Sequence, residues 1–281
     1  MEDITPKLNR LKDIIGGCDS ALVAFSGGVD STLVLRVAVE TLGEKALAIT
    51  GRSLSVPEWE LEDADRLARG MGAAHRVMDT QELEVAEYRA NGPDRCYHCK
   101  TELFSKLETV REAEGFTWII DGTNADDLGD HRPGMQARRE RGIRSPLVEA
   151  ELTKEDVRAL SRHYGLETAE KPAFACLASR FPYGTEVTAE GLQTIAAAED
   201  AVRRLGFKQF RVRHHGDVAR LEVDPRELDR ALEPAFRKRI VEALKGAGYR
   251  YASLDLEGYR TGSLNEVLPA TIGRMQKQEK A

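Results

Sequence analysis

The stretch Ala21-Leu-Val-Ala-Phe-Ser26-Gly27-Gly28-Val-Asp30-Ser31 decides the fold of this chain. Its apolar first half predicts a buried parallel strand, and the apolar-rich residues 32–41 after it predict a helix. Between them, two glycines let the backbone come close to a ligand, and two serines offer hydroxyl groups. Because the free N–H groups and the dipole of the next helix favour negative charge, we expect this loop to bind pyrophosphate.

The loop is not a Walker A loop, because no Gly-Lys-Ser/Thr closes it, and it is not Gly-x-Gly-x-x-Gly. It resembles the Ser-Gly-Gly-x-Asp-Ser signature of the PP-loop ATP pyrophosphatases, which split ATP into AMP and pyrophosphate to adenylate a substrate. The resemblance implies a pyrophosphate site that also orients Mg²⁺ indirectly through Asp30. Its residues would be Ser26, Gly27, Gly28, Asp30 and Ser31. The plainer alternative is an ordinary glycine-containing turn, and the flanking serines and Asp30 disfavour it.

Length, charge and cysteine content limit the classes of protein. The 281 residues suffice for two domains, and 41 basic against 47 acidic residues give a net charge of −6, so we expect neither nucleic acid nor a membrane as partner. The amino-terminal residues have no basic and apolar signal pattern, which predicts a cytoplasmic protein. Four cysteines are too few and too unevenly spaced for a secreted disulfide scaffold, so thiol or metal chemistry is the better expectation.

The rest of the first 184 residues alternates strand-like and helical runs. Strand-like runs at residues 45–50, 75–78 and 118–121 are separated by helices, one after Ser55 and one starting near Lys100. Capping boxes are predicted at Ser55-Val-Pro-Glu58 and Thr153-Lys-Glu-Asp156. The alternation predicts an α/β fold in which helices sandwich a parallel sheet, as in the PP-loop, adenine nucleotide alpha hydrolase-like proteins.

The pattern changes near residue 184, where we place a domain boundary between residues 1–184 and 185–281. The second part predicts a smaller α+β domain for substrate binding or oligomerisation. Its expected elements are a helix over 189–205, strands at 210–214 and 218–223, a helix around 233–245 and a strand at 249–254.

Ligands of open parallel sheets bind beyond the carboxyl ends of the strands, so residues just after each strand are the next candidates. Arg52 and Ser53 follow the second strand, where backbone groups can take the adenine edge. The run 121–127 follows a later strand. Its Gly, Asn and Asp residues can be explained by a turn alone, but this explanation leaves Thr123 and Asp127 available for phosphate or Mg²⁺ roles. Gly122 belongs to the same run and is a further nucleotide-site candidate. By resemblance, Arg144, which precedes Ser-Pro-Leu, also lies at the nucleotide.

The segment Lys171-Pro-Ala-Phe-Ala-Cys176-Leu-Ala-Ser179-Arg180 resembles the Lys-Pro-Ala-x-x-Cys-Leu-x-Ser-Arg segment of the LarE family. Members are ATP-dependent sulfur transferases that help build the nickel-pincer nucleotide of lactate racemase. They adenylate a carboxylate of pyridinium-3,5-biscarboxylic acid mononucleotide, and a protein-bound sulfur displaces AMP. The resemblance assigns that sulfur to Cys176, a thiol flanked by Lys171 and Arg180, whose charges would lower its pKa. A buried structural cysteine is the weaker reading of this basic, loop-like segment.

Cys96-Tyr-His-Cys99 adds two thiols. A Cys-x-x-Cys pair can be redox-active, ligate metal or have no special role, and only His98 offers a nearby fourth ligand for zinc. By resemblance, Cys96, Cys99 and Cys176 suit a [4Fe–4S] cluster whose open iron holds a sulfide. In members with only the last cysteine, the cysteine's own sulfur is sacrificed and dehydroalanine remains.

Alternation along the strand at Arg211-Val-Arg213-His214 points both arginines to one face. Such a pair is usually solvated, but the segment resembles a family stretch that binds the substrate phosphate. The resemblance thus assigns substrate binding to Ser179, Arg180, Arg211 and Arg213, and it also implies a homo-oligomer, namely a hexamer, and a nickel-insertion partner protein.

Three other functions stay open. An amide-forming ligase of the GMP or NAD synthetase type would need ammonia and no cysteine. A tRNA thiolase would need a basic face that the net charge of −6 does not supply. A non-enzymatic nucleotide sensor would not require Cys176.

Overall fold

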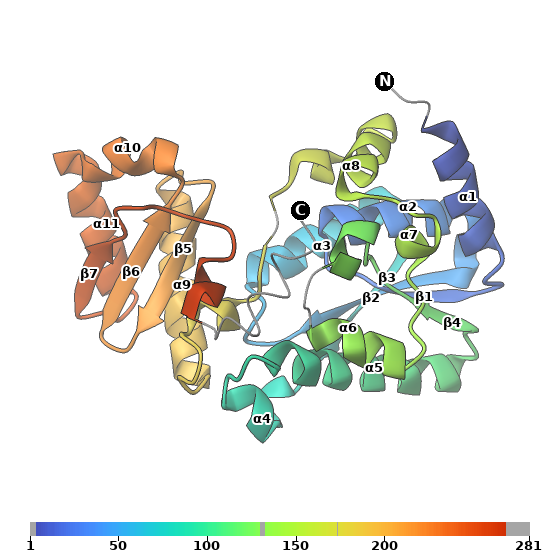
Figure 1. Cartoon of the computed structure of the whole chain (residues 1–281), viewed down its shortest axis with the longest axis horizontal. Helices are drawn as coiled ribbons and strands as arrows, with labels where there is room; N and C mark the ends of the chain where they lie inside the picture. Colours follow the sequence, from blue (N-terminus) through green and yellow to red (C-terminus); the bar gives the residue numbers. More distant parts are fainter. Residues whose placement is uncertain (1–3, 130–132, 173, 268–281) are drawn as a thin grey trace. The chain divides into compact units, whose positions relative to one another are not determined.

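The structure is a computed structural model that describes residues 4–129, 133–172 and 174–267. The chain divides into two compact units, each described here by itself (Figure 1). Unit 1 holds the residues up to Glu82 and Cys96–Phe174, and unit 2 holds Leu83–Arg95 and the described residues from Ala175 onward. The domain boundary expected at residue 184 is a separate statement and remains a prediction.

Unit 1 contains the predicted parallel sheet, with four strands in the order β3-β2-β1-β4. The strands are β1 (Ala21–Ala24), β2 (Ala46–Arg52), β3 (Ala74–Asp79) and β4 (Trp118–Ile120). In the register, Ala21 of the central strand β1 pairs with Ala46 on one side and Trp118 on the other. All three pairings are parallel, so the carboxyl ends of these strands meet at one edge, and the predicted α/β fold is confirmed.

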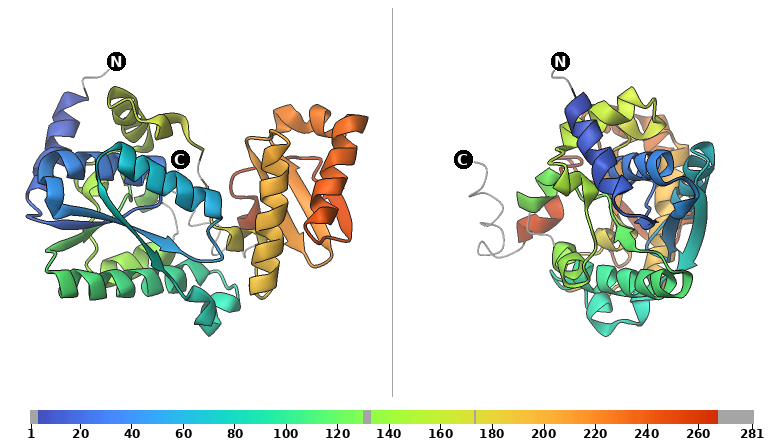
Figure 2. Two further views of the ribbon diagram at one scale, coloured as in Figure 1. Left: turned by 180° about the vertical axis from the view of Figure 1, so that it is seen from behind. Right: turned by 90° about the vertical axis from the view of Figure 1, so that its right-hand side faces the viewer.

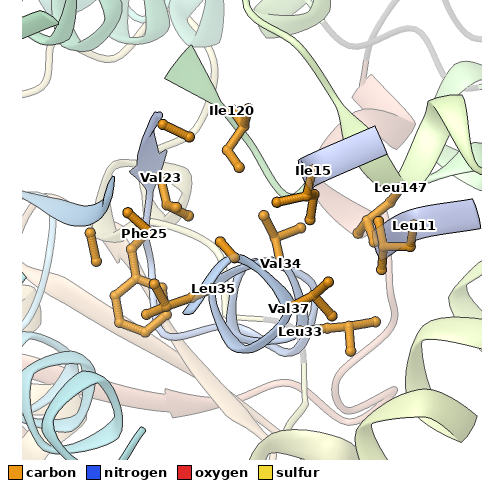
Figure 3. Packing of buried hydrophobic residues seen from close by; sticks show 14 of the residues in the cluster. Leu11, Ile15, Val23, Phe25, Leu33, Val34, Leu35, Val37, Ile120 and Leu147 are labelled. Atoms are coloured by element: carbon orange, nitrogen blue, oxygen red, sulfur yellow. The ribbon is translucent and has the colours of Figure 1, made fainter. Parts of the chain in front are cut away.

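Helices cover both faces of this sheet (Figures 1 and 2). The helices of unit 1 are α1 (Thr5–Gly16), α2 (Val29–Leu42), α3 (Glu58–Gly70), α5 (Arg95–Glu114), α6 (Pro133–Glu140), α7 (Pro146–Glu149) and α8 (Lys154–His163). On one face, Val23 of β1 packs with α1, α2, α3 and α8 in the larger core cluster, in which α2 is central (Figure 3). On the other face, Leu22 packs with Phe104 and Leu107 of α5. Burial on both faces explains why β1 reads as an uninterrupted apolar run.

One of the two predicted capping boxes is confirmed. The Thr153 side chain accepts from the backbone N–H of Asp156, and the Asp156 side chain accepts from the backbone N–H of Thr153, so α8 begins as expected. The box at Ser55 is wrong: α3 begins at Glu58, with Pro57 as its N-cap and no side-chain cap bond. The residue before a proline avoids helical backbone angles, which delays the helix until Pro57 has passed. Helix α5 likewise begins at Arg95, ahead of the expected start near Lys100.

Unit 2 is the predicted small α+β unit. Its strands are β5 (Phe210–His215), β6 (Val218–Val223) and β7 (Tyr251–Leu254), and its helices are α4 (Ala86–Arg89), α9 (Ala189–Arg204), α10 (Leu228–Leu232) and α11 (Pro234–Gly246). Strand β6 pairs antiparallel with β5 and parallel with β7. The core of the unit lies between this sheet and helices α9 and α11.

Short 3-10 helices connect these elements at Gly43–Lys45, Glu82–Glu84, Ala125–Gly129, Glu167–Glu170, Leu177–Arg180, Pro225–Glu227 and Ser263–Val267. Within the described ranges, no helix is long and apolar enough to span a membrane.

Candidate active site

The loop between β1 and α2 is shaped by its two serines. The Ser31 hydroxyl accepts from the backbone N–H of Ser26 (3.2 Å) and lies 3.1 Å from the Ser26 hydroxyl. It also lies 3.2 Å from the carbonyl oxygen of Gly28, to which it donates. Helix α2 begins right after Gly28, so its first N–H groups face the loop. This is the geometry of an anion site at a helix N-terminus.

Two glycines allow close approaches around this loop. Gly27 has a left-handed backbone (φ +67°), and a Cβ there would lie 3.3 Å from both the Cα and the Cβ of Ala64 on α3. Gly122 follows β4, and a Cβ there would lie 2.7 Å from the backbone nitrogen of Ser31. Real Cβ atoms do not come this close to backbone, so Gly122 lets the end of β4 meet the start of α2. The structure therefore brings Gly122 to the loop, as the sequence predicts.

Asp30, in the first turn of α2, has two partners from distant parts of the chain. Its Oδ2 lies 2.5 Å from Nζ of Lys154, the first residue of α8, and its Oδ1 accepts from the side-chain amide of Asn124 at 3.1 Å. Neither partner is among the predicted site residues. Lys154 places a cation at the loop, which suits an anionic ligand.

Lys171 supplies a second cation to this loop. Its Nζ lies 3.0 Å from Oε2 of Glu60 on α3 and 3.4 Å from the carbonyl oxygen of Gly27. Glu60 is buried, and burial raises the pKa of its carboxyl, against the opposing effect of Lys171. The sequence predicts that Lys171 flanks Cys176, and the structure places its ammonium group at the PP-loop.

The turn after β4 is organised by the nearly buried Asp121. Its carboxylate accepts from both the N–H and the hydroxyl of Thr123 and from the hydroxyl of Ser145. The Asp127 carboxylate accepts from the N–H of Asn124 at 3.1 Å. Thr123 and Asp127 thus lie in the same short segment as Asn124, the partner of Asp30.

Arg52 and Ser53 lie at the carboxyl end of β2, on the same edge of the sheet. Arg52 is exposed and forms a bidentate ion pair with Asp79 at the end of β3, with donor–acceptor distances of 2.6 and 3.1 Å. Ser53 accepts from the N–H of Ser55. The placement of both residues agrees with the strand-end rule, and their contact with adenine remains a prediction.

Arg144 is the predicted nucleotide residue that the structure does not bring to the PP-loop. Its backbone pairs with β4, but its guanidinium binds Glu149, lies 3.2 Å from Sγ of Cys18 and stacks over the ring of Trp118. Cys18 precedes β1 and Trp118 begins β4, so this group lies at the amino ends of the strands. Burial raises the pKa of the Cys18 thiol.

In unit 2, Arg180 organises the backbone around Cys176. Arg180 is fully buried, and its Nη1 donates to the carbonyl oxygens of Ala175 (2.7 Å) and Cys176 (3.2 Å) and to the hydroxyl of Ser179 (2.9 Å). Its Nε and Nη2 form a bidentate pair with Glu199 of α9. The guanidinium therefore fixes the turn that presents Cys176, a half-buried residue with a free thiol.

The predicted arginine pair lies on β5 beside this turn. Arg213 binds Glu222 at 2.8 Å and donates to the carbonyl oxygen of Ser179, and Arg211 stacks over the ring of Tyr259. Burial lowers the pKa of Arg211, and the charge of Arg180 adds to that effect. Three guanidiniums and the carboxylates of Glu199 and Glu222 thus lie together in this buried cluster. The cluster brings the predicted substrate residues together.

Cys96 and Cys99 lie in the first turns of α5, three residues apart and so on one face of the helix. They belong to unit 1, whereas Cys176 belongs to unit 2. In the part of the chain that the structure describes, no three His, Cys, Asp or Glu side chains form a group that could hold a metal ion.

A parallel sheet with a serine- and glycine-rich loop between β1 and α2, backed by two lysines, defines the class of PP-loop ATP-utilising enzymes.

The chain is 47% identical over 262 residues to an uncharacterized protein of Synechocystis sp., covering 93% of this chain and 98% of that protein. It is 39% identical to the pyridinium-3,5-bisthiocarboxylic acid mononucleotide synthase of Lactiplantibacillus plantarum, covering 88% and 89%. An NH₃-dependent NAD⁺ synthetase of Methanococcoides burtonii matches 33% of this chain and 37% of its own length at 39% identity. No family model matches the chain. The chain belongs to the LarE family of enzymes.

Proposed function

We propose that this enzyme is an ATP-dependent sulfur transferase that converts a carboxylate of pyridinium-3,5-biscarboxylic acid mononucleotide into a thiocarboxylate. The relative in Lactiplantibacillus plantarum is named for the bisthiocarboxylic product. The observation that carries the proposal is the PP-loop with Lys154 and Lys171 beside it, in a chain that also holds Cys176 in an arginine-bound turn.

The first step we propose is adenylation at the PP-loop. A carboxylate oxygen of the substrate attacks the α-phosphorus of ATP, and pyrophosphate leaves with the electrons of the broken P–O bond. The N–H groups at the start of α2 and the ammonium groups of Lys154 and Lys171 stabilise the charge on the leaving pyrophosphate.

Asp30 and Asp127 fit the Mg²⁺ that PP-loop relatives use, since carboxylate oxygens are the ligands that this hard cation prefers. Bound Mg²⁺ would neutralise phosphate charge.

The second step we propose uses the sulfur of Cys176. Its thiolate attacks the acyl carbon of the adenylate and AMP leaves, which joins the substrate to the chain as a thioester. Removal of the α-proton of Cys176 then forms the Cα=Cβ double bond and breaks the Cβ–S bond. The sulfur leaves with the substrate as a thiocarboxylate, and dehydroalanine remains in the chain.

The family resemblance also allows a sulfide bound to a [4Fe–4S] cluster as the sulfur source. Cys96 and Cys99 are two of the three thiolates that this route requires, and Cys176 is the third. Cys96 and Cys99 belong to unit 1 and Cys176 belongs to unit 2, so the proposed steps use the sulfur of Cys176 itself.

We assign the phosphate of the mononucleotide to the arginine cluster of unit 2. Ser179, Arg180, Arg211 and Arg213 gather there, and guanidinium groups are common phosphate ligands. The amide-forming ligases share a smaller part of the chain, 33% for the NAD⁺ synthetase, and have no use for Cys176. The homo-oligomer, the hexamer in particular, and the nickel-insertion partner remain predictions.

The experiment separates the two steps. With ATP, Mg²⁺ and the mononucleotide, Cys176→Ala should still exchange labelled pyrophosphate into ATP but form no thiocarboxylate. This variant can adenylate the substrate, but it has no thiol to attack the adenylate. Cys18→Ala serves as the matched control and should form product. Thiocarboxylate formation by Cys176→Ala would show that another group delivers the sulfur.

A further inference from the structure

His75 on β3 connects helix α3 to the strand end from which the PP-loop starts. Its imidazole is almost fully buried, with 3% of the side chain exposed, and it meets the ring of Phe25 edge-on at 5.9 Å. Nε2 lies 2.9 Å from the hydroxyl of Thr50 on β2, and Nδ1 lies 3.2 Å from Oδ1 of Asp65 on α3. The Thr50 hydroxyl lies 2.8 Å from the carbonyl oxygen of Phe25, the residue before Ser26.

Counting protons along this chain of contacts fixes the direction of the hydrogen bond between His75 and Thr50. Thr50 has one hydroxyl proton, and the carbonyl of Phe25 accepts it, so Nε2 of His75 must donate to the Thr50 oxygen. Asp65, which also pairs with Arg69, lies at Nδ1 on the other side of the ring. The ring thus links α3 to Thr50 and, through Thr50, to the carbonyl of Phe25.

We propose that His75 is a positioning residue whose Nε2–H sets the PP-loop for ATP by holding the Thr50 hydroxyl on the carbonyl of Phe25. This carbonyl and the N–H of Ser26 belong to one planar peptide group. The N–H of Ser26 donates to the hydroxyl of Ser31, so the orientation of this peptide enters the loop directly. The inference rests on the proposed use of ATP by this loop.

Loss of the donor at Nε2 changes the chain of contacts in a defined way. An acceptor at this position takes the proton of Thr50. The carbonyl of Phe25 then loses its side-chain donor. The N–H of Phe25 still binds the carbonyl of Ile49, so the strand stays paired while the peptide before Ser26 is released.

The charges facing His75 are few. Asp65 faces it from α3 and is shared with Arg69, while Phe25 and Thr50 face it from β1 and β2 and are uncharged. Arg76, next to it on β3, lies on the other side of the strand and pairs with Glu114. Asp65 is therefore the one charged group that faces the imidazole among the described residues that contact it.

Two variants of His75 separate its two contacts. Gln places a side-chain amide near the position of Nε2 and keeps a donor for Thr50, whereas Asn places its amide near Nδ1 and keeps a donor for Asp65. We expect His75→Asn and Thr50→Val to weaken binding of a non-hydrolysable Mg²⁺–ATP analogue about tenfold, as loss of one hydrogen bond implies. His75→Gln and Thr50→Ser should bind within about threefold of the wild type.

Calorimetry of analogue binding and ¹⁵N NMR of the imidazole test the inference. The inference predicts a protonated Nε2 in the nucleotide-free protein, a readout that needs no activity and no variant. An unprotonated Nε2 would overturn it, and so would equal affinities for His75→Asn and His75→Gln. A wild-type protein that binds no ATP analogue, with Nε2 protonated, would instead contradict the proposed function.

Discussion

At the scale of single residues, Arg180 stabilises the fold of unit 2 in addition to the roles that the sequence assigns to it. The sequence predicts a cation that activates Cys176 and binds substrate, and the structure shows a guanidinium that holds the carbonyls of Ala175 and Cys176 and the buried carboxylate of Glu199. Sequence reasoning missed Glu199 because its partner lies 19 residues away along the chain and on another element. Because both groups are buried, removal of either one leaves the other as an unpaired buried charge and lowers the free energy of unfolding.

Arg180→Ala should therefore lower the free energy of unfolding by about 3–5 kcal/mol, because Glu199 is left buried without its bidentate partner. Urea denaturation followed by circular dichroism measures the change. The matched control is Arg203→Ala on α9, whose ion pair with Asp200 is exposed, with an expected cost below about 1 kcal/mol. Similar costs for the two variants would contradict this account of Arg180.

At the scale of elements, the strand–loop–helix unit of β1, the PP-loop and α2 could be predicted almost entirely from sequence. The apolar run Ala21–Ala24 is buried on both faces, and the glycines and serines mark the turn. Lys154 and Asn124 could not be predicted as partners of Asp30, since they come from elements 124 and 94 residues away. Arg144 is assigned to the nucleotide site by resemblance to a motif. Its guanidinium is held at the amino ends of the strands by contacts with Cys18 and Trp118.

The two loop glycines should respond differently to substitution. Gly27→Ala forces a left-handed backbone on alanine, at about 1–2 kcal/mol, and brings its Cβ against Ala64. Gly28 has an ordinary φ of −80°, and a Cβ there meets only the Ser26 hydroxyl at 3.4 Å. Gly28→Val should therefore keep a near-normal melting temperature yet abolish AMP formation, because a branched side chain crowds the anion-facing hydroxyl. Wild-type amounts of AMP from Gly28→Val would contradict the pyrophosphate site.

At the scale of the whole molecule, the similarity to relatives extends over both units, since it covers 88% and 93% of the chain. Sequence reasoning predicted both sheets, but it could not predict that Leu83–Arg95 belongs to unit 2. Hydrogen bonds from Asn91 to the carbonyls of Pro182 and Thr185 join that segment to unit 2, across about 90 residues of chain, and no local pattern encodes such a contact.

The source of the sulfur is also a property of the whole chain. The cluster route predicts that protein reconstituted anaerobically binds about four irons and turns over repeatedly, and that Cys96→Ala or Cys99→Ala loses both properties. The sacrificial route predicts little iron, one turnover, and a near-normal single-turnover yield from the same two variants. Intact mass after one turnover distinguishes the routes, because sacrifice of Cys176 removes H₂S, about 34 Da, from the chain.

The most direct test of the central claim is to identify the nucleotide and pyridine products of one reaction containing ATP, Mg²⁺ and the carboxylated mononucleotide. The account predicts AMP and pyrophosphate together with a mononucleotide in which sulfur has replaced one carboxylate oxygen. AMP formation should depend on the mononucleotide, because adenylation needs its carboxylate. ADP and phosphate as products, or an amide in place of the thiocarboxylate, would contradict the account.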